Sequence, residues 1–99
     1  MNNDAALPYD DYMSQRLQDK AFAIAYLNES LAGESDLSAF LVALRRILDA
    51  QNLSKSALAK EAGVSREKLY TMLSAKGNPE WHSLKAILDS LGYKLTISA

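Results

Sequence analysis

Apolar residues recur at three- and four-residue steps over most of this chain, which is the spacing of an α-helix with one buried face. The two clearest stretches are residues 36–51 and 80–91. Their apolar stripes are Leu37, Phe40, Leu41, Leu44 and Leu48 in the first, and Leu84, Ile87, Leu88 and Leu91 in the second. The pattern predicts two amphipathic helices that pack on a common core.

The residues before these stripes predict a disordered start and two further helices. Residues 1–8 are expected to be disordered, and Asp10 or Asp11 is placed to cap a short helix that ends near residue 18. Asp19 begins a second helix that ends near residue 31. Its apolar residues cover more than one face, which predicts burial on two sides. They are Phe22, Ile24, Ala25, Tyr26, Leu27 and Leu31.

Cap and turn residues divide the stretch between the two stripes into two short helices. Ser54 is placed to N-cap a helix over residues 55–62, and Ser65 to N-cap a helix that ends near residue 77. Gly63 stands between them, where a left-handed residue is commonly needed. The apolar residues that can anchor this pair to the core are Leu58, Ala62, Val64, Leu69 and Leu73.

Two short helices that cross steeply over a tight turn leave the second helix protruding from the protein. Ala59 is small enough for the crossing, and Gly63 leaves the turn unhindered. The outer face of the second helix can then enter the major groove of DNA. A helical hairpin that exists only for packing is the alternative interpretation.

The end of the chain shows two other patterns. Asn78-Pro79 is expected to open the helix over residues 80–91, because proline is tolerated in a first helical turn. Residues 93–97 alternate apolar and polar side chains, which predicts a short β-strand. A single strand needs a partner, either a second copy of the chain or the sheet edge of another protein. A tail with Leu95 and Ile97 packed on the core is the alternative.

Composition excludes several kinds of site. The 99-residue chain has no cysteine, which rules out disulfides and thiolate metal sites. His82 is the only histidine, so a surface or capping role is expected rather than a metal or acid–base role. No apolar run approaches the ~20 residues of a membrane span, and the N-terminus has no basic signal region. We expect a cytoplasmic protein without enzyme activity or cofactor.

Charge is distributed unevenly along the chain. Residues 1–39 have a net charge of −5 and residues 40–99 a net charge of +4, although the whole chain has only −1. This asymmetry fits a basic nucleic-acid surface joined to an acidic arm with another partner. Chance scatter of surface charge is the alternative. Arg45 and Arg46 lie off the apolar stripe of their helix and can pair with carboxylates of the same domain.

The pattern Leu-Ala-x-x-Ala-Gly-Val-Ser-x-x-x-Leu-Tyr-x-x-Leu over residues 58–73 resembles the helix-turn-helix of the lambda-repressor-like (Cro, XRE) family. The order of the flanking helices matches too. The resemblance implies an all-α helix-turn-helix bundle with an N-terminal helical extension and a short C-terminal β-strand. The expected divisions are a disordered start over 1–8, the extension over 9–34, the DNA-binding domain over 35–92 and the strand or tail over 93–99.

A wider resemblance covers about residues 9–97. Ala25-Tyr26-Leu27-Asn28, Glu67-Lys68-Leu69-Tyr70, Gly77-Asn78-Pro79 and Leu91-Gly92-Tyr93-Lys94-Leu95 look like the HigA-type addiction-module antidote proteins. This implies a type II antitoxin that binds a basic RelE/HigB-like toxin and, as a homodimer on double-stranded operator DNA, represses its own operon. The bulky pair Trp81-His82 departs from the pattern. Trp81 is either a core residue or an interface anchor.

An acidic arm, residues 10–36 with a net charge of −4, is the expected complement of such a basic toxin. The alternative is that this helical hairpin only completes the core. Two other functions compete with the antitoxin: a phage-type repressor without a toxin partner, and a helical adaptor that has lost DNA binding.

Ten side chains are the candidate DNA-binding residues: Ser65, Arg66, Glu67, Lys68, Tyr70, Thr71, Ser74, Lys55, Lys76 and Asn78. Arg66 is the first candidate for a base contact, because its guanidinium can donate two hydrogen bonds to guanine. Thr71 can touch a thymine methyl group. Glu67 either accepts from cytosine or supports the helix N-terminus.

The remaining candidates concern the DNA backbone. Lys55, Lys68, Lys76 and Asn78 are candidates for phosphate contact. Ser65 is expected to cap its helix, which also presents N–H groups to phosphate. Tyr70 either meets the DNA or packs at the rim of the core.

Overall fold

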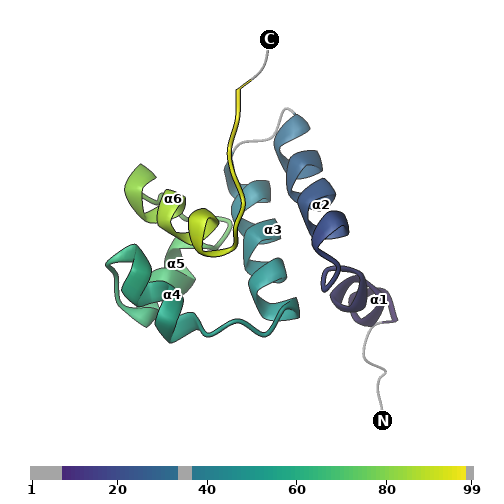
Figure 1. Ribbon diagram of the computed structural model, residues 1–99, viewed down its shortest axis with the longest axis horizontal. Helices are drawn as coiled ribbons and strands as arrows, with labels where there is room; N and C mark the ends of the chain where they lie inside the picture. Colours follow the sequence, from purple (N-terminus) through teal and green to yellow (C-terminus); the bar gives the residue numbers. More distant parts are fainter. Residues whose placement is uncertain (1–7, 34–36, 98–99) are drawn as a thin grey trace.

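The computed structural model describes residues 8–33 and 37–97, with side chains from residue 11 onward. These residues form six α-helices and no strand (Figure 1). The helices are α1 (Pro8–Arg16), α2 (Lys20–Ala32), α3 (Leu37–Ala50), α4 (Lys55–Ala62), α5 (Arg66–Met72) and α6 (Trp81–Ser90). The expected all-α architecture is confirmed. None of the described helices combines the length and the hydropathy of a membrane-spanning segment.

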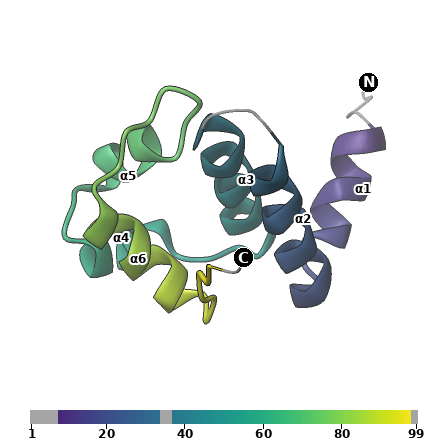
Figure 2. The ribbon, with the colours of Figure 1, turned by 90° about the horizontal axis from the view of Figure 1, so that it is seen from above.

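Helix α3 lies at the centre of the molecule. Helices α1 and α2 pack on one side of it, and α4, α5 and α6 form a group on the other side (Figures 1 and 2). The buried residues of all six helices join in one hydrophobic cluster. Gln51 adds a hydrogen bond between the end of α3 and the α1–α2 connection, because its Nε2 donates to the Leu17 carbonyl oxygen at 3.1 Å. The N-terminal helices are therefore part of the core.

Three helices begin at the polar residues that the sequence predicts as caps. The Asp19 carboxylate accepts from the Ala21 amide at 3.0 Å. The hydroxyl oxygen of Ser54 accepts from the Ala57 amide at 3.2 Å, and that of Ser65 from the Lys68 amide at 3.1 Å. Each bond satisfies an amide that has no partner within its helix.

Gly63 ends α4 in the left-handed conformation, with φ +72°. Its amide donates to the Lys60 carbonyl at 3.2 Å, and the Val64 amide donates to the Ala59 carbonyl at 3.0 Å. This pair of bonds is a Schellman motif, which reverses the chain directly after a helix. Ala59 is buried at the crossing, as expected. The turn sets the direction in which α5 leaves α4.

We expect Gly63→Ala to lower the free energy of unfolding by about 1–2 kcal/mol, because an L-residue is strained at this φ. No atom lies within 4 Å of an added Cβ, so the cost comes from the backbone alone. Gly63→Asn is the matched control and should cost less, because asparagine tolerates the left-handed region. Urea unfolding of the three proteins measures the difference. Equal stability of all three would show that this turn is not left-handed.

Two predicted helix ends at the start of the chain need correction. The first helix is not capped by Asp10 or Asp11, because it already begins at Pro8, whose fixed φ and missing N–H suit a first helical position. It also ends at Arg16 rather than near residue 18. Pro8 is therefore helical. The expected disorder of residues 1–7 lies outside the described residues, as does Asp36, the expected start of the helix over residues 36–51.

The ends of α5 and α6 differ from the prediction as well. Helix α5 stops at Met72 rather than near residue 77, because Leu73 leaves the helical region with ψ 45°. The loop then folds back so closely that a Cβ on Gly77 would collide with the Met72 carbonyl. Helix α6 begins at Trp81, because Glu80 has an extended backbone with ψ 149°. Pro79 thus precedes the helix and does not open it.

The expected burial of α2 on two sides is wrong. Ala23 and Leu27 are buried, whereas Ile24, Ala25 and Leu31 are exposed. Helix α2 is an outer helix that packs on α3 along one face. The other face therefore keeps apolar side chains in solvent.

The predicted C-terminal β-strand is absent from the described residues. Residues 93–97, called the tail below, are extended, and Tyr93 alone is buried there. The last backbone hydrogen bond described runs from the Tyr93 amide to the Leu88 carbonyl, at 2.9 Å. A strand requires a hydrogen-bonding neighbour, and the described part of the monomer offers none. The alternative of a tail packed on the core is met only in part. Leu95 is 45% exposed and lines a groove with the core residue Phe40, whereas Ile97 is fully exposed.

Candidate nucleic-acid interface

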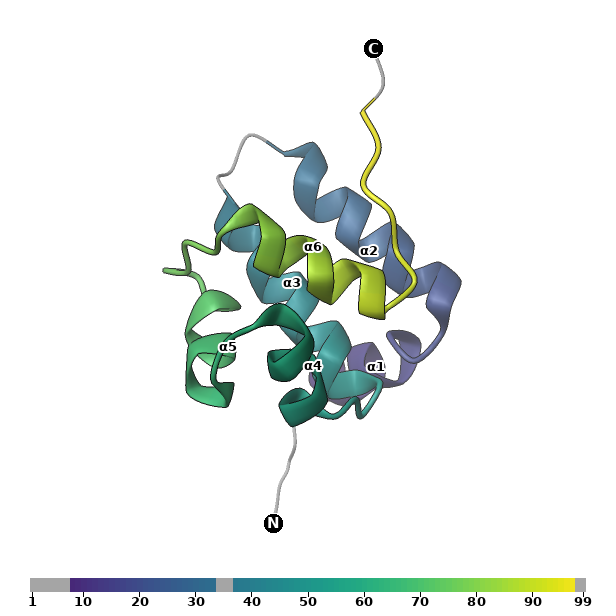
Figure 3. The same cartoon turned by 60° about the vertical axis from the view of Figure 1, so that its left-hand side comes forward.

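Helix α5 lies at one end of the molecule, and α1 lies at the other (Figure 2). Figure 3 shows α5 beside α4 on the near side of the molecule. Leu69 and Met72 on its inner face are buried, as is Leu73 at its C-cap. The predicted core anchors Leu58 and Ala62 are buried as well, and Val64 packs against the core while partly exposed. Helix α5 is thus anchored along one face, which leaves the other free to meet a partner.

The outward side of α5 carries polar and charged residues. Arg66, Glu67, Lys68 and Thr71 are all exposed. The Thr71 hydroxyl donates to the Glu67 carbonyl at 3.2 Å, so its hydrogen is already used within the helix. Arg66 and Lys68 can each donate hydrogen bonds to a ligand without breaking any side-chain contact described for them. Glu67 lies in the first turn, where its charge favours the helix dipole.

Two serines at the ends of α5 serve the helix itself. Ser65 is exposed, but its hydroxyl oxygen already caps the Lys68 amide. Ser74 is half-buried, and its hydroxyl donates to the Thr71 carbonyl at 2.7 Å. Both residues therefore stabilise the ends of α5. The hydroxyl hydrogen of Ser74 is already donated, whereas Ser65 acts only as an acceptor in its described bond.

Arg45 belongs to this surface, although it is not among the predicted DNA-binding residues. It extends from α3, and its guanidinium carbon lies 5.2 Å from the centroid of the Tyr70 ring on α5. A cation at this distance is attracted to an aromatic face. The expected pairing of Arg45 with a carboxylate is not observed among the described residues. Tyr70 is half-buried, so it packs at the rim and supports an added positive charge beside α5.

The predicted phosphate contacts fall into two groups. Lys76 and Asn78 are exposed in the loop after α5, next to the candidate surface. Lys55 instead pairs with Asp49 at 2.7 Å, and its side chain is only 18% exposed. Lys55 must therefore leave an ion pair before it can contact phosphate, which sets it apart from Lys68 and Lys76.

The surface around α5 has the chemistry of an anion-binding face. Arg45, Arg66, Lys68 and Lys76 bring four positive charges to this surface, and α5 itself has one carboxylate, that of Glu67. Among the described residues, no group of three or more His, Cys, Asp or Glu could hold a metal ion. His82 is exposed. The exposed cations of this surface can contact phosphates and other hydrogen-bond acceptors.

Comparison with known proteins gives the family. Residues 8–99 match a family model described as "Probable addiction module antidote protein". An uncharacterized protein of Haemophilus influenzae (strain ATCC 51907 / DSM 11121 / KW20 / Rd) is 38% identical over 72 residues, which cover 73% of this chain and 71% of that protein. No solved structure matches the chain. The match over almost the whole chain shows that this protein belongs to the family of addiction module antidote proteins.

Proposed function

We propose that this protein is a HigA-type antitoxin that neutralises a RelE/HigB-like toxin and represses its own operon by binding DNA through α4 and α5. Membership of the antidote family implies a cognate toxin. The observation that carries the DNA-binding part is the outward face of α5, where Arg66 and Lys68 are exposed at the start of the helix. The pattern over residues 58–73 resembles the lambda-repressor-like helix-turn-helix, and the turn at Gly63 fits it.

In this proposal, α5 lies in the major groove with its N-terminal end toward the bases. Arg66 donates to guanine, while Lys68, Lys76 and Asn78 contact phosphates on the strands beside it. Arg45, held against Tyr70, adds a further phosphate contact from α3. The protein acts as a homodimer on a two-fold operator, and it acts by binding rather than by catalysis.

A mobility-shift assay with the DNA upstream of the gene tests the DNA-binding part. The protein should bind this fragment more tightly than a scrambled fragment of equal length, at every salt concentration used. The affinity should fall linearly with the logarithm of salt concentration, because phosphate contacts release counterions. Equal affinity for both fragments, or no binding at low salt, would contradict repression through this helix.

We propose that the toxin binds the acidic arm, which α1 and α2 build at the end of the molecule remote from α5 (Figure 2). Asp11 and Glu29 are exposed there, and neither has an ion pair within the described residues. The nearby cation Arg16 is engaged, because its guanidinium lies 4.4 Å from the Phe22 ring and donates to the Tyr12 hydroxyl. The two carboxylates are therefore available to a basic protein.

Charge reversal tests this surface better than deletion of the arm, because Met13, Leu17, Ala23 and Leu27 of the arm belong to the core. We expect Asp11→Lys and Glu29→Lys each to slow association with the toxin, by about 3- to 10-fold at low salt. Glu80→Lys is the matched control, since Glu80 is exposed outside the arm and makes no side-chain cap bond. Stopped-flow mixing measures the rates. Equal rates for all three variants would place the toxin elsewhere.

A further inference from the structure

The tail leaves the protein with its backbone unpaired. No backbone hydrogen bond joins residues 94–97 to any other described residue. The tail nevertheless starts from a fixed point, because Tyr93 is buried and the Lys20 ammonium lies 5.9 Å from the centroid of its ring. An extended segment with unpaired amides and carbonyls, anchored at its first residue, can pair with another strand.

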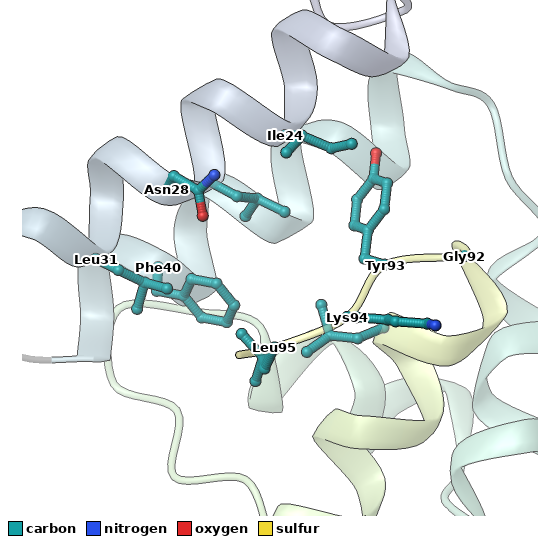
Figure 4. Close-up of a pocket in the computed structure, with 10 residues that line it drawn as sticks. Ile24, Asn28, Leu31, Phe40, Gly92, Tyr93, Lys94 and Leu95 are labelled. Atoms are coloured by element: carbon teal, nitrogen blue, oxygen red, sulfur yellow. The ribbon is translucent and has the colours of Figure 1, made fainter. Parts of the chain in front are cut away.

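Apolar grooves lie on both sides of the tail. The first groove, of about 300 Å³, runs between the tail and α2 and is lined by Ile24, Leu31 and Phe40 (Figure 4). The second, of about 280 Å³, runs between the tail and α6 and includes Trp81. Figure 4 shows Leu95 beside Phe40, whereas Lys94 points away from it. Tyr93 and Leu95 therefore share the apolar side of the tail, and alternation places Ile97 with them.

Most of the exposed large apolar side chains of the described residues gather on this face. Ile24, Leu31, Trp81 and Leu95 line the grooves and are 39–59% exposed, and Ile97 projects beyond them at 101%. A contiguous apolar face of this kind marks an interface. The projecting side chain and the open grooves belong to the same surface of one chain, so a second copy related by a two-fold axis presents both features to the first.

Charge also favours a second copy as the occupant. Lys94 is the one charged residue that lines the first groove, and the second adds only Lys85 and Asp89, which pair with each other at 2.9 Å. The face therefore offers no free carboxylate to the basic toxin of the proposed function. A second copy brings a matching face with the same low charge.

We propose that two copies of this protein associate through their tails, which pair as an antiparallel two-stranded ribbon centred on Leu95. In this register Ile97 lies opposite the partner subunit's Tyr93, and the apolar stripes of both tails cover the grooves. Lys94 lies opposite the partner subunit's Thr96, so like charges do not face each other. This inference rests on the homodimer of the proposed function. It does not depend on DNA binding or on toxin binding.

Sedimentation velocity of the full chain, without DNA or toxin, tests the association. We expect a concentration-dependent dimer whose dissociation constant rises at least about tenfold in Ile97→Glu, because a buried isoleucine becomes a charge in the ribbon. Ile97 is fully exposed in the monomer, so the substitution leaves the fold intact, which circular dichroism checks. A chain that stays monomeric at all concentrations, or a dimer that Ile97→Glu does not weaken, overturns the proposal.

A cysteine scan tests the register. The chain has no cysteine of its own, so each variant has a single thiol. Directly opposed Cβ atoms lie about 4.5–5.5 Å apart in such a ribbon, and diagonal ones lie farther apart. Leu95→Cys should therefore form a covalent dimer under mild oxidation, whereas the neighbouring control Thr96→Cys should not. A covalent dimer of Thr96→Cys but not of Leu95→Cys would contradict pairing between copies. A monomeric protein whose tail is shielded from thiol modification only when the toxin is bound would contradict it as well. Loss of DNA binding alone leaves these results unchanged.

Discussion

Replacing Leu44 with alanine is expected to lower the free energy of unfolding by about 2–5 kcal/mol. Leu44 is completely buried in α3, the helix against which the N-terminal helices pack. The substitution removes apolar contacts and leaves a cavity that the surrounding helices cannot fill. Because a small domain is stable by only about 5–15 kcal/mol, this loss is a large part of the total stability. Urea unfolding at a fixed protein concentration measures it.

Leu37→Ala is the matched control, because Leu37 begins the same helix and is 42% exposed. Its cost should stay below about 1 kcal/mol, since solvent fills the space that the side chain leaves. Similar losses for the two variants would mean that α3 is not the centre of the core.

Arg66→Ala is expected to raise the dissociation constant for the upstream DNA by about 5- to 150-fold, which corresponds to about 1–3 kcal/mol. Arg66 is the first residue of α5 and is exposed, so its loss does not disturb the fold. The loss should be smaller on scrambled DNA, because a base contact serves one sequence. Lys68→Ala should instead weaken binding to all sequences and lower the salt dependence by about one unit of slope. Fluorescence anisotropy at several salt concentrations separates the two effects.

Arg46→Ala is the matched control for charge. Arg46 is exposed on α3 like its neighbour Arg45, but it lines a groove with Tyr26 and Glu29 of α2. Its loss should change the affinity by less than about twofold, because distant charges are screened at physiological salt. Arg45→Ala should fall between the two. If Arg66→Ala bound the DNA normally and Arg46→Ala bound it weakly, the DNA-binding surface would lie on another face of the protein.

Local signals in the sequence predict much of this fold. The caps Asp19, Ser54 and Ser65 and the left-handed turn at Gly63 each depend on a residue and its near neighbours, and all four are confirmed. The apolar stripe of α3 is confirmed in the same way, except at Leu37. The resemblance to addiction-module antidotes is confirmed at the level of the family, whereas the DNA-binding residues remain predictions.

Features that depend on distant parts of the chain could not be predicted in this way. The proximity of Arg45 to Tyr70 arises because α3 and α5 meet in space. The exposure of Ile24 and Leu31 follows from the outer position of α2, whose composition resembles that of a helix buried on two sides. The alternation in the tail indicates a capacity for pairing, and the described monomer does not contain the neighbour that a strand needs.

The central position of α3 has a consequence for regulation. Helices α1 and α2 pack on this helix, and its Arg45 stands against Tyr70 of α5 at the other end of the molecule. The surfaces that we propose for DNA and for the toxin therefore lie on opposite sides of α3 in one copy. If DNA binding and toxin binding affect each other within one copy, α3 is the element that contacts both sides. A rotation of α3 would shift Arg45 relative to α5.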